Sequence, residues 1–543
     1  MTTTLKVLVT ALCLLAANGP IAADDVDQAM STIRPEAIRA HMTFLADDLL
    51  EGRDTGSKGY EIAARYVASR LMELGVQPGG PNGSWYQQVP FRKAVPMESM
   101  VVLLNGDATQ TLEWKKDYLV SGSVLETLTE IEAPILYVGF GVTAPEFDYD
   151  DYEGVDARGK IVAMLRNAPS SFPSNARAHY ASSSNKARTA AERGAIGIIS
   201  LQTPEQENGH PFEKSTRFAN YPSLEWLDSH GDPQGVQPSI RVGLRLSPHA
   251  TEMLFSESPV ALEAIWKAAA ANEPRPVELP TRIRVRSASS REEIQSPNVV
   301  GTIPGSDLVL ENEFIVFVAH LDHVGTGEPE NGDGIHNGAY DNASGIAVLI
   351  EVARAFRSLP APPKRSIVLL AVTGEEKGLL GADYFANHPS VDGEIVAAFS
   401  IDMFLMLYPL HDVVAFGADS SSLGESMRAA ASRLGVKLSP DFAPEEVLFV
   451  RTDHYPFVKK GIPALFLVHG LESGDPQVNG GLLMRNWLTE YYHSPKDQMD
   501  QEMDFGAGAA FARLNFLLGL EVANADERPK WNEGDFFGAK FAH

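Results

Sequence analysis

Seven side chains that could bind metal or move protons lie at the ends of predicted strands or beside predicted helices in the second half of the chain. They are His320, Asp322, Asp341, Glu375, Glu376, Asp402 and His493. In sheets covered by helices, functional groups gather at the carboxyl ends of the strands, so we expect these residues to lie together. Imidazole nitrogens and carboxylate oxygens, with no thiolate among them, suit zinc and also manganese or cobalt.

This set of candidate ligands is large enough for a pair of metal ions. Two ions about 3.5–4 Å apart need a bridging carboxylate and open positions for water and substrate. Two histidines and three carboxylates can supply such a site if one carboxylate is shared. The adjacent Glu375 and Glu376 then offer a division of roles, in which one side chain binds metal and its neighbour acts as a general base.

The elements that position these residues alternate between apolar strands and helices from residue 295 to 525. Predicted strands cover 313–320, 366–373, 395–401, 413–416 and 464–468, and predicted helices cover 343–357, 378–387, 423–434 and 505–522. Continuous apolar strands between helices favour an α/β fold in which helices cover both faces of one sheet.

The first half of the chain has a different character. It is predicted to contain helices at 35–50 and 59–74, short strands within 84–120, and a block at 125–275 in which strand-like runs surround a helix at 184–193. This block holds no cluster of histidines and carboxylates. A stretch rich in Pro and Glu at 272–280 is typical of a linker. The polar tail, 526–543, is expected to be an extended segment docked on the surface.

The N-terminus has the pattern of a cleavable secretory signal peptide. Residues 1–23 hold one lysine, an apolar run and then small residues before Asp24. The run is shorter than the ~20 residues that span a bilayer, and we expect no later stretch to reach that length. The single cysteine, Cys13, lies inside this segment, which excludes thiol catalysis and cysteine-type zinc sites from the mature chain. We therefore expect a periplasmic or extracellular protein with no stable membrane anchor.

The overall charge bears on the partners of the protein. Its 543 residues include 45 Lys and Arg against 71 Asp and Glu, a formal net charge of −26. A polyanion does not usually bind nucleic acid through its bulk surface, so nucleic acid is not expected as a partner.

Six short motifs resemble those of a known family. They are AHLDHVG at 319–325, GAYDNASG at 338–345, TGEEKG at 373–378, IDM at 401–403, RTDHYPF at 451–457 and YHSP at 492–495. In order and spacing they resemble the di-zinc aminopeptidases of metallopeptidase family twenty-eight. Residues 125–275 resemble the protease-associated domain inserted in many members, and residues 44–59 resemble their N-terminal region.

The resemblance implies a role for each matching residue. The implied metal ligands are His320 and Asp402 for one zinc, Glu376 and His493 for the other, and Asp341 as the bridge between them. The implied catalytic residues are Glu375 as general base, Asp322 as the hydrogen-bond partner that fixes the tautomer of His320, and Tyr492 as the donor to the oxyanion. Arg451 would help to bind substrate. His323 and His454 are expected to be structural, and the apolar segment 404–410 is expected to shape a pocket wall.

The resemblance also implies an organisation and an activity. The expected parts are a signal peptide at 1–23, the N-terminal part of a peptidase domain at 24–124, an inserted β-rich protease-associated domain at 125–280, a zinc-peptidase domain at 281–525 and a tail at 526–543. The expected peptidase fold is a mixed sheet flanked by helices on both faces. The expected activity is that of an aminopeptidase with two Zn²⁺ per chain, or Co²⁺ or Mn²⁺ in their place, acting on peptides with a free N-terminus.

Three alternatives stay open at this point. A carboxypeptidase would use the same metal site from the other end of the peptide. A glutaminyl cyclotransferase would have one functional zinc and no peptide cleavage. A non-catalytic scaffold would have a gap in the ligand set, and the sequence has none.

Overall fold

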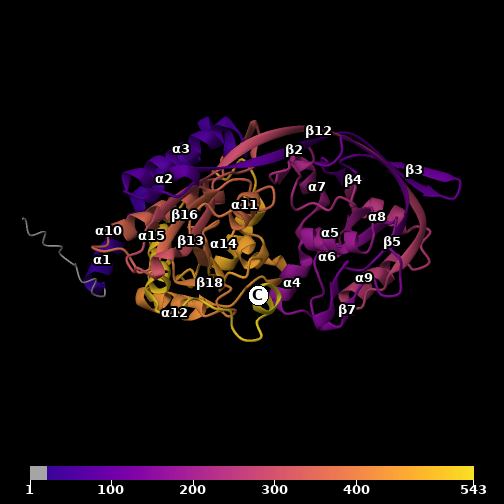
Figure 1. Cartoon of the computed structure of the whole chain (residues 1–543). Helices are drawn as coiled ribbons and strands as arrows, with labels where there is room; N and C mark the ends of the chain where they lie inside the picture. The colour runs from indigo at the N-terminus through magenta and orange to yellow at the C-terminus, as the bar shows by residue number, and fades with distance from the viewer. Residues whose placement is uncertain (1–20, 543) are drawn as a thin grey trace, which may run out of the picture.

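Two long strands, β2 (Tyr86–Asn105) and β12 (Val277–Ile303), arch over the molecule and join its two lobes (Figure 1). The computed structural model describes residues 21–542. The two strands pair antiparallel from Arg282 opposite Leu104 to Val299 opposite Tyr86, with one register shift near Ser287. The prediction of short strands within 84–120 was therefore wrong for residues 86–105, which form one long strand. The prediction of a linker at 272–280 was wrong for residues 277–280, which belong to β12. The first half of β12 alternates buried and exposed residues, the pattern of a half-buried strand, which outweighed its Pro and Glu content.

The larger lobe, which we call the main lobe, is built on a mixed sheet. Its strand order is β19-β18-β20-β17-β13-β16-β12. The strand bounds are β13 (Glu313–His320), β16 (Ser366–Val372), β17 (Glu394–Ser400), β18 (Asp412–Phe416), β19 (Lys437–Ser439) and β20 (Ala464–His469). β13 runs parallel to both of its neighbours, β16 and β17, whereas β12 is antiparallel to β16 and β18 to β20.

Helices cover both faces of this sheet. On one face, Ile315 and Phe317 of β13 share a core with helices α2 (Pro35–Leu45), α3 (Lys58–Glu73), α10 (Ser344–Ser358), α12 (Leu423–Leu434) and α15 (Phe505–Asn524). On the other face, Val316 and Val318 share a core with α11 (Leu380–Asn387) and α13 (Tyr455–Val458). The predicted mixed α/β sheet with helices on both faces is confirmed.

One helix among the described residues is long and apolar enough to cross a membrane. This helix, α15, has 20 residues, so the expectation that no later stretch reaches spanning length was wrong. Most of α15 is buried inside the main lobe, where it packs on α2, α10 and α12. Its apolar character is accounted for by this core position.

The second lobe has a hydrophobic core of its own. This core is contributed by residues from Val101 to Val285, and we call residues 101–285 the distal lobe. Its elements include β3 (Ala108–Leu112), β4 (Tyr118–Val120), β5 (Leu128–Tyr137), β8 (Ile161–Leu165), β9 (Gly197–Leu201), β11 (Val242–Leu246), α4 (Ser174–Ala181), α5 (Ser183–Glu192), α8 (Pro248–Phe255) and α9 (Leu262–Ala270). Packing of the distal lobe thus begins before the boundary at 125 that the sequence suggests.

Several shorter elements complete the described part of the fold. They are α1 (Ala23–Ser31), η1 (Asp48–Arg53), α6 (Pro204–Gly209), α7 (Phe212–Ser215), η4 (Thr216–Phe218), β10 (Ser223–Trp226), β14 (Gly325–Glu330), β15 (Asp333–His336) and α14 (Gly480–Glu490). The predicted helix 35–50 stops at Leu45 because Asp47 caps η1, its side chain accepting a hydrogen bond from the backbone N–H of Leu49 at 2.9 Å.

The two ends of the chain complete the description. The tail was expected to be an extended surface segment, but its last turn forms helix α16 (Phe536–Phe541), and Phe537 is fully buried against Phe449 of the main lobe. Helix α16 also contacts α4 of the distal lobe, so it packs between the two lobes. Of the predicted signal peptide, residues 1–20, including Cys13, lie outside the described residues.

Candidate metal centre

Three parallel strands bring the predicted residues to one edge of the main sheet. In the register of the sheet, His320 of β13 pairs with Val372 of β16, and Val318 of β13 pairs with Ser400 of β17. The residues that follow these strand ends, Glu375 and Asp402, therefore meet His320 at the same edge. Continuous buried apolar residues hold the strands in this register.

Asp341 lies between two histidines. One of its oxygens, Oδ1, is 3.3 Å from His320 Nε2, and the other, Oδ2, is 3.2 Å from His493 Nε2. His320 Nε2 is also 3.1 Å from Asp402 Oδ1, and His493 Nε2 is 3.0 Å from Glu376 Oε2. These side chains thus form two groups that share Asp341, His320–Asp341–Asp402 and His493–Asp341–Glu376, and His323 lies within the second group as well.

The side chains of this cluster are suited to binding metal cations. In each group, one atom from every side chain lies within 4.8 Å of the others. Asp341 Oδ2 is buried and has no hydrogen-bond partner, although it faces His493 Nε2 closely. A buried carboxylate oxygen without a donor is costly unless a cation neutralises it. Neutral imidazoles and carboxylates at this spacing are the donors that zinc takes up.

The two adjacent glutamates have opposite electrostatic environments. Burial raises the pKa of the Glu375 carboxyl well above its ordinary value. Burial opposes the ionisation of Glu376 as well, but His493 and His323 outweigh it and hold the pKa of Glu376 well below its ordinary value. A pair of carboxyl groups with pKa values pushed apart can divide the tasks of holding a proton and holding a charge.

Asp322 contacts His320 in a way that differs from the expectation. His320 Nδ1 is 3.0 Å from the backbone carbonyl oxygen of Asp322, not from its carboxylate. The carboxylate instead accepts the backbone N–H groups of Glu375 at 3.2 Å and Glu376 at 3.4 Å, and the hydroxyl of Thr55 at 3.1 Å. The predicted hydrogen bond to the imidazole is therefore corrected: the backbone of Asp322 makes it, and the side chain orients the two glutamates. Burial raises the pKa of Asp322 to about 6.

Tyr492 and Arg451 lie beside the same cluster. The Tyr492 ring stacks on His493, with the ring centroids 3.9 Å apart. Arg451 Nη1 is 3.6 Å from Glu446 Oε2. Burial opposes the charge of Arg451, but Tyr492, Glu446 and Glu375 together raise its pKa. All nine residues singled out in the sequence therefore lie in or next to one site.

Three further residues at the centre were not among the predicted catalytic, metal-binding or substrate-binding residues. His323 Nδ1 is 2.7 Å from Glu376 Oε1, so His323 contacts a candidate metal ligand in addition to packing in the core. Asp497 is fully buried and accepts the backbone N–H groups of Tyr340 at 3.0 Å and Asp341 at 3.1 Å. Asp453 is fully buried, neither carboxylate oxygen has a hydrogen-bond partner, and burial raises its pKa well above its ordinary value. Each lies within or close to a quoted motif, which was the signal available.

The N-terminal segment also supports the centre. The fully buried guanidinium of Arg53 donates to the carbonyl oxygens of Leu321 at 2.9 Å, Asn337 at 2.6 Å and Gly338 at 3.0 Å, and to that of Leu45. The carbonyls of Leu321, Asn337 and Gly338 belong to the segments that carry His320 and Asp341. Burial lowers the pKa of Arg53 to about 10, against the opposing effect of the nearby carboxylates.

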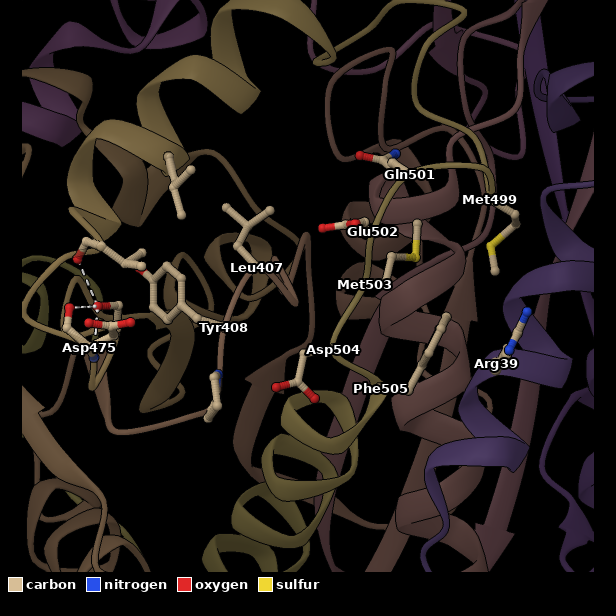
Figure 2. A pocket seen from close by; sticks show the side chains of 14 residues that line it. Arg39, Leu407, Tyr408, Asp475, Met499, Gln501, Glu502, Met503, Asp504 and Phe505 are labelled. Carbon is tan, nitrogen blue, oxygen red and sulfur yellow. Dashed lines mark hydrogen bonds between the residues drawn. The ribbon is translucent and has the colours of Figure 1, made fainter.

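The apolar segment 404–410 does line a pocket. Figure 2 shows Leu407 and Tyr408 on one side of this pocket and Glu502, Asp504 and Phe505 on the other. None of the five candidate metal ligands is among its lining residues.

Residues 298–517 match the model of peptidase family M28. This range contains all nine residues predicted for the site. This part of the chain is therefore similar to peptidase family M28.

Individual relatives are more distant. The aminopeptidase YwaD of Bacillus subtilis (strain 168) is 27% identical over 212 residues, covering 38% of this chain and 40% of the relative. A probable zinc metalloprotease of Leptosphaeria maculans is 29% identical over 217 residues, covering 34% and 49% of the two chains. The chain thus spans less than half the length of these curated relatives.

Among solved structures, the aminopeptidase from Aneurinibacillus sp. strain AM-1 has a similar fold. The TM-score is 0.55 at 20% identity, and the similarity covers 93% of this chain and 97% of the other. At this identity the likeness establishes the fold alone.

Proposed function

We propose that this protein is a di-zinc aminopeptidase that removes N-terminal residues from peptides. The observation that carries the proposal is the pair of histidine–carboxylate groups joined by Asp341, whose two oxygens each face a different histidine. A shared carboxylate is what a two-metal hydrolytic site requires. The family of residues 298–517 and the relatives named aminopeptidases support the same activity.

Each residue of the site has a role in this proposal. His320 and Asp402 would hold one zinc, Glu376 and His493 would hold the other, and Asp341 would be shared between them. Bound zinc supplies polarisation of the scissile carbonyl and a lowered pKa for the attacking water. Glu375 takes a proton from that water and passes it to the leaving amine. Tyr492 donates a hydrogen bond to the developing oxyanion, and Arg451 contacts the substrate.

The rival activities make different demands on the ligand set. A glutaminyl cyclotransferase with one zinc has no use for two complete groups, and a scaffold has no use for either. Cobalt or manganese could replace zinc in the same donor set. Metal analysis of the purified protein tests this step: we expect close to two zinc ions per chain, one ion favours the cyclotransferase, and none refutes the zinc enzyme.

The direction of cleavage separates an aminopeptidase from a carboxypeptidase. We would follow one unlabelled peptide by mass spectrometry, with its N-terminus free and, in parallel, acetylated. The proposal predicts stepwise loss of residues from the free N-terminus and no loss from the acetylated peptide. Loss from the other end would make the protein a carboxypeptidase instead.

Two further parts of the proposal concern the whole chain. The pattern of residues 1–23 supports export to the periplasm or the medium, and N-terminal sequencing of the exported protein would test cleavage near Ala22 or Ala23. Residues 125–280 are proposed to be a protease-associated domain inserted into the peptidase domain, in keeping with the separate hydrophobic core of the distal lobe.

A further inference from the structure

One segment of the distal lobe leaves its own core and reaches the metal centre. Helix η4 ends at Phe218, and the Phe218 ring lies 5.9 Å from the His493 ring, centroid to centroid, at an interplanar angle of 79°. This is an edge-to-face aromatic contact with a candidate metal ligand. It comes from a part of the chain in which the sequence offers no cluster of ligands.

Contacts to the main lobe hold this segment in place. Arg217 Nη1 is 3.2 Å from Glu330 Oε1 of β14. The Tyr221 ring lies under Lys377 Nζ at 5.1 Å, and Lys377 directly follows the Glu375–Glu376 pair. A Cβ atom added to Gly327 would lie only 2.9 Å from the Tyr221 hydroxyl, so this hydroxyl packs directly against the backbone of β14. The Phe218 ring itself is flanked by Tyr221 at 5.0 Å and by the Arg217 guanidinium at 4.7 Å.

Phe218 stands on the open side of the centre. The side chains of His493, Glu375 and Asp402 are 19%, 12% and 9% exposed, whereas those of His320, Asp341 and Glu376 are at most 4% exposed. The cluster is therefore most accessible at His493, which Phe218 contacts. The Phe218 ring is half-buried, so it still presents apolar surface at this entrance.

We propose that Phe218 of the distal lobe is a specificity residue of the metal centre and packs against a large apolar side chain that flanks the scissile bond of the peptide. This inference rests on the proposed peptidase function and adds the substrate class to it. A peptide side chain placed against Phe218 removes apolar surface of both partners from water. Small or charged side chains gain little or nothing from that contact.

The contacts made by the neighbours of Phe218 favour this role over a purely structural role for Phe218 in joining the two lobes. Arg217, Tyr221 and Lys377 already make the polar and cation–π contacts that join the segment to the main lobe. Phe218 adds no hydrogen bond to that junction, and its contact in the main lobe is a ring that binds metal in the proposed mechanism. An apolar ring at this position is therefore available to contact the side chains of a bound peptide.

The experiment compares substrate preference in Phe218→Ala, Phe218→Leu and the unaltered protein, all loaded with zinc. Two peptide series are used, X-Ala-Ala and Ala-X-Ala, with Leu, Ala and Glu at X. The readout is the ratio of kcat/KM for Leu to kcat/KM for Ala in each series. This ratio is independent of the fraction of protein that is folded and active, so partial unfolding of a variant does not move it.

We expect Phe218→Ala to lower the Leu-to-Ala ratio by about tenfold or more in at least one series, since a large apolar contact discriminates substrates by about 10–200-fold. Phe218→Leu should keep most of the preference, because it keeps an apolar side chain. Phe147→Ala is the matched control: Phe147 also ends a three-residue helix of the distal lobe, η3 (Pro145–Phe147), is half-buried, and stacks on Phe172. It should leave both ratios unchanged.

The outcomes separate the inference from the function on which it rests. If the unaltered protein releases N-terminal residues but Phe218→Ala keeps both ratios, the role of Phe218 is refuted and the aminopeptidase stands. An equal change in Phe147→Ala would also refute it, because the effect would then belong to the distal lobe in general. If the unaltered protein releases no residue from either series, the proposed function fails, and the inference fails with it.

Discussion

The support of Asp341 by Asp497 leads to a quantitative prediction for the substitution Asp497→Asn. The two carboxylate oxygens of Asp497 accept the backbone N–H groups of Tyr340 and Asp341 at 3.0 and 3.1 Å. Asparagine has nearly the same shape but only one acceptor oxygen. In either orientation its NH₂ group therefore faces one of the two backbone N–H groups, which is left buried without a partner.

The size of the effect follows from this lost acceptor. A hydrogen bond to a charged group contributes about 1.5–3 kcal/mol, and an unsatisfied buried donor costs about 1–3 kcal/mol. We expect Asp497→Asn to lower the free energy of unfolding by about 2–3 kcal/mol. Because the affected backbone carries the bridging ligand, metal affinity should also fall by roughly 10–100-fold, as is usual when a group that orients a ligand is altered.

A second buried aspartate provides the control. Asp412 is 1% exposed and accepts the hydroxyl of Ser439 at 2.6 Å and the backbone N–H of Glu472 at 2.9 Å, in a part of the sheet that carries no candidate ligand. Asp412→Asn should destabilise the fold by a similar amount without changing metal affinity. The assays are urea unfolding of the metal-free proteins and competition of each protein with a chelator for zinc. Equal zinc affinities for the two variants would refute the reasoning.

Three further predictions address the base, the metal and the acid sensitivity of the fold. Glu375→Gln should lower kcat by about 10²–10⁴-fold with zinc content unchanged; a variant that keeps more than a tenth of kcat would show that Glu375 is not the base. Removing zinc with a chelator should lower the thermal midpoint and adding it back should restore it, since the buried carboxylates of Asp341 and Glu376 lose the cations that stabilise them; an unchanged midpoint would contradict this. Burial lowers the pKa of His179 to about 3, against about 6.5 when unfolded. The unfolded state therefore binds more protons between these values, and stability falls as the pH drops below about 6.5. His179 should account for about 2 kcal/mol of the loss between pH 7 and pH 5, and in urea unfolding His179→Gln should flatten the pH dependence by that amount.

The parts of the site that could be predicted from sequence are those fixed by local pattern. The apolar strands that end at His320, Val372 and Ser400 have buried, uninterrupted cores, so their ends could be located to within about one residue. Parallel pairing then brings the residues after them together. Residues that act through side chains aimed at the backbone, such as Asp497, leave no comparable pattern. The same holds for Asp322, whose carboxylate turned out to serve two backbone amides in place of an imidazole.

The errors in the fold have a common physical origin. The composition of 272–280 suggested a flexible connection, and short strands were expected within 84–120. Pairing between distant segments overrode both local signals, because residues 277–279 pair with β5 and β2 pairs with β12 from Arg282 onward. The apolar helix α15 and the tail residue Phe537 were likewise misjudged, since burial depends on which surfaces the rest of the chain brings to them.

The metal centre depends on segments that are far apart in the chain. Arg53 of the N-terminal segment fixes the carbonyls of Leu321 and Gly338, next to His320 and close to Asp341. Only a guanidinium presents enough donors in one rigid plane for these contacts. Phe218 belongs to the distal lobe, which the β2–β12 pair attaches to the main sheet, and its ring contacts His493. The ligands themselves come from short motifs, so the complete site requires both these motifs and the contacts from distant segments.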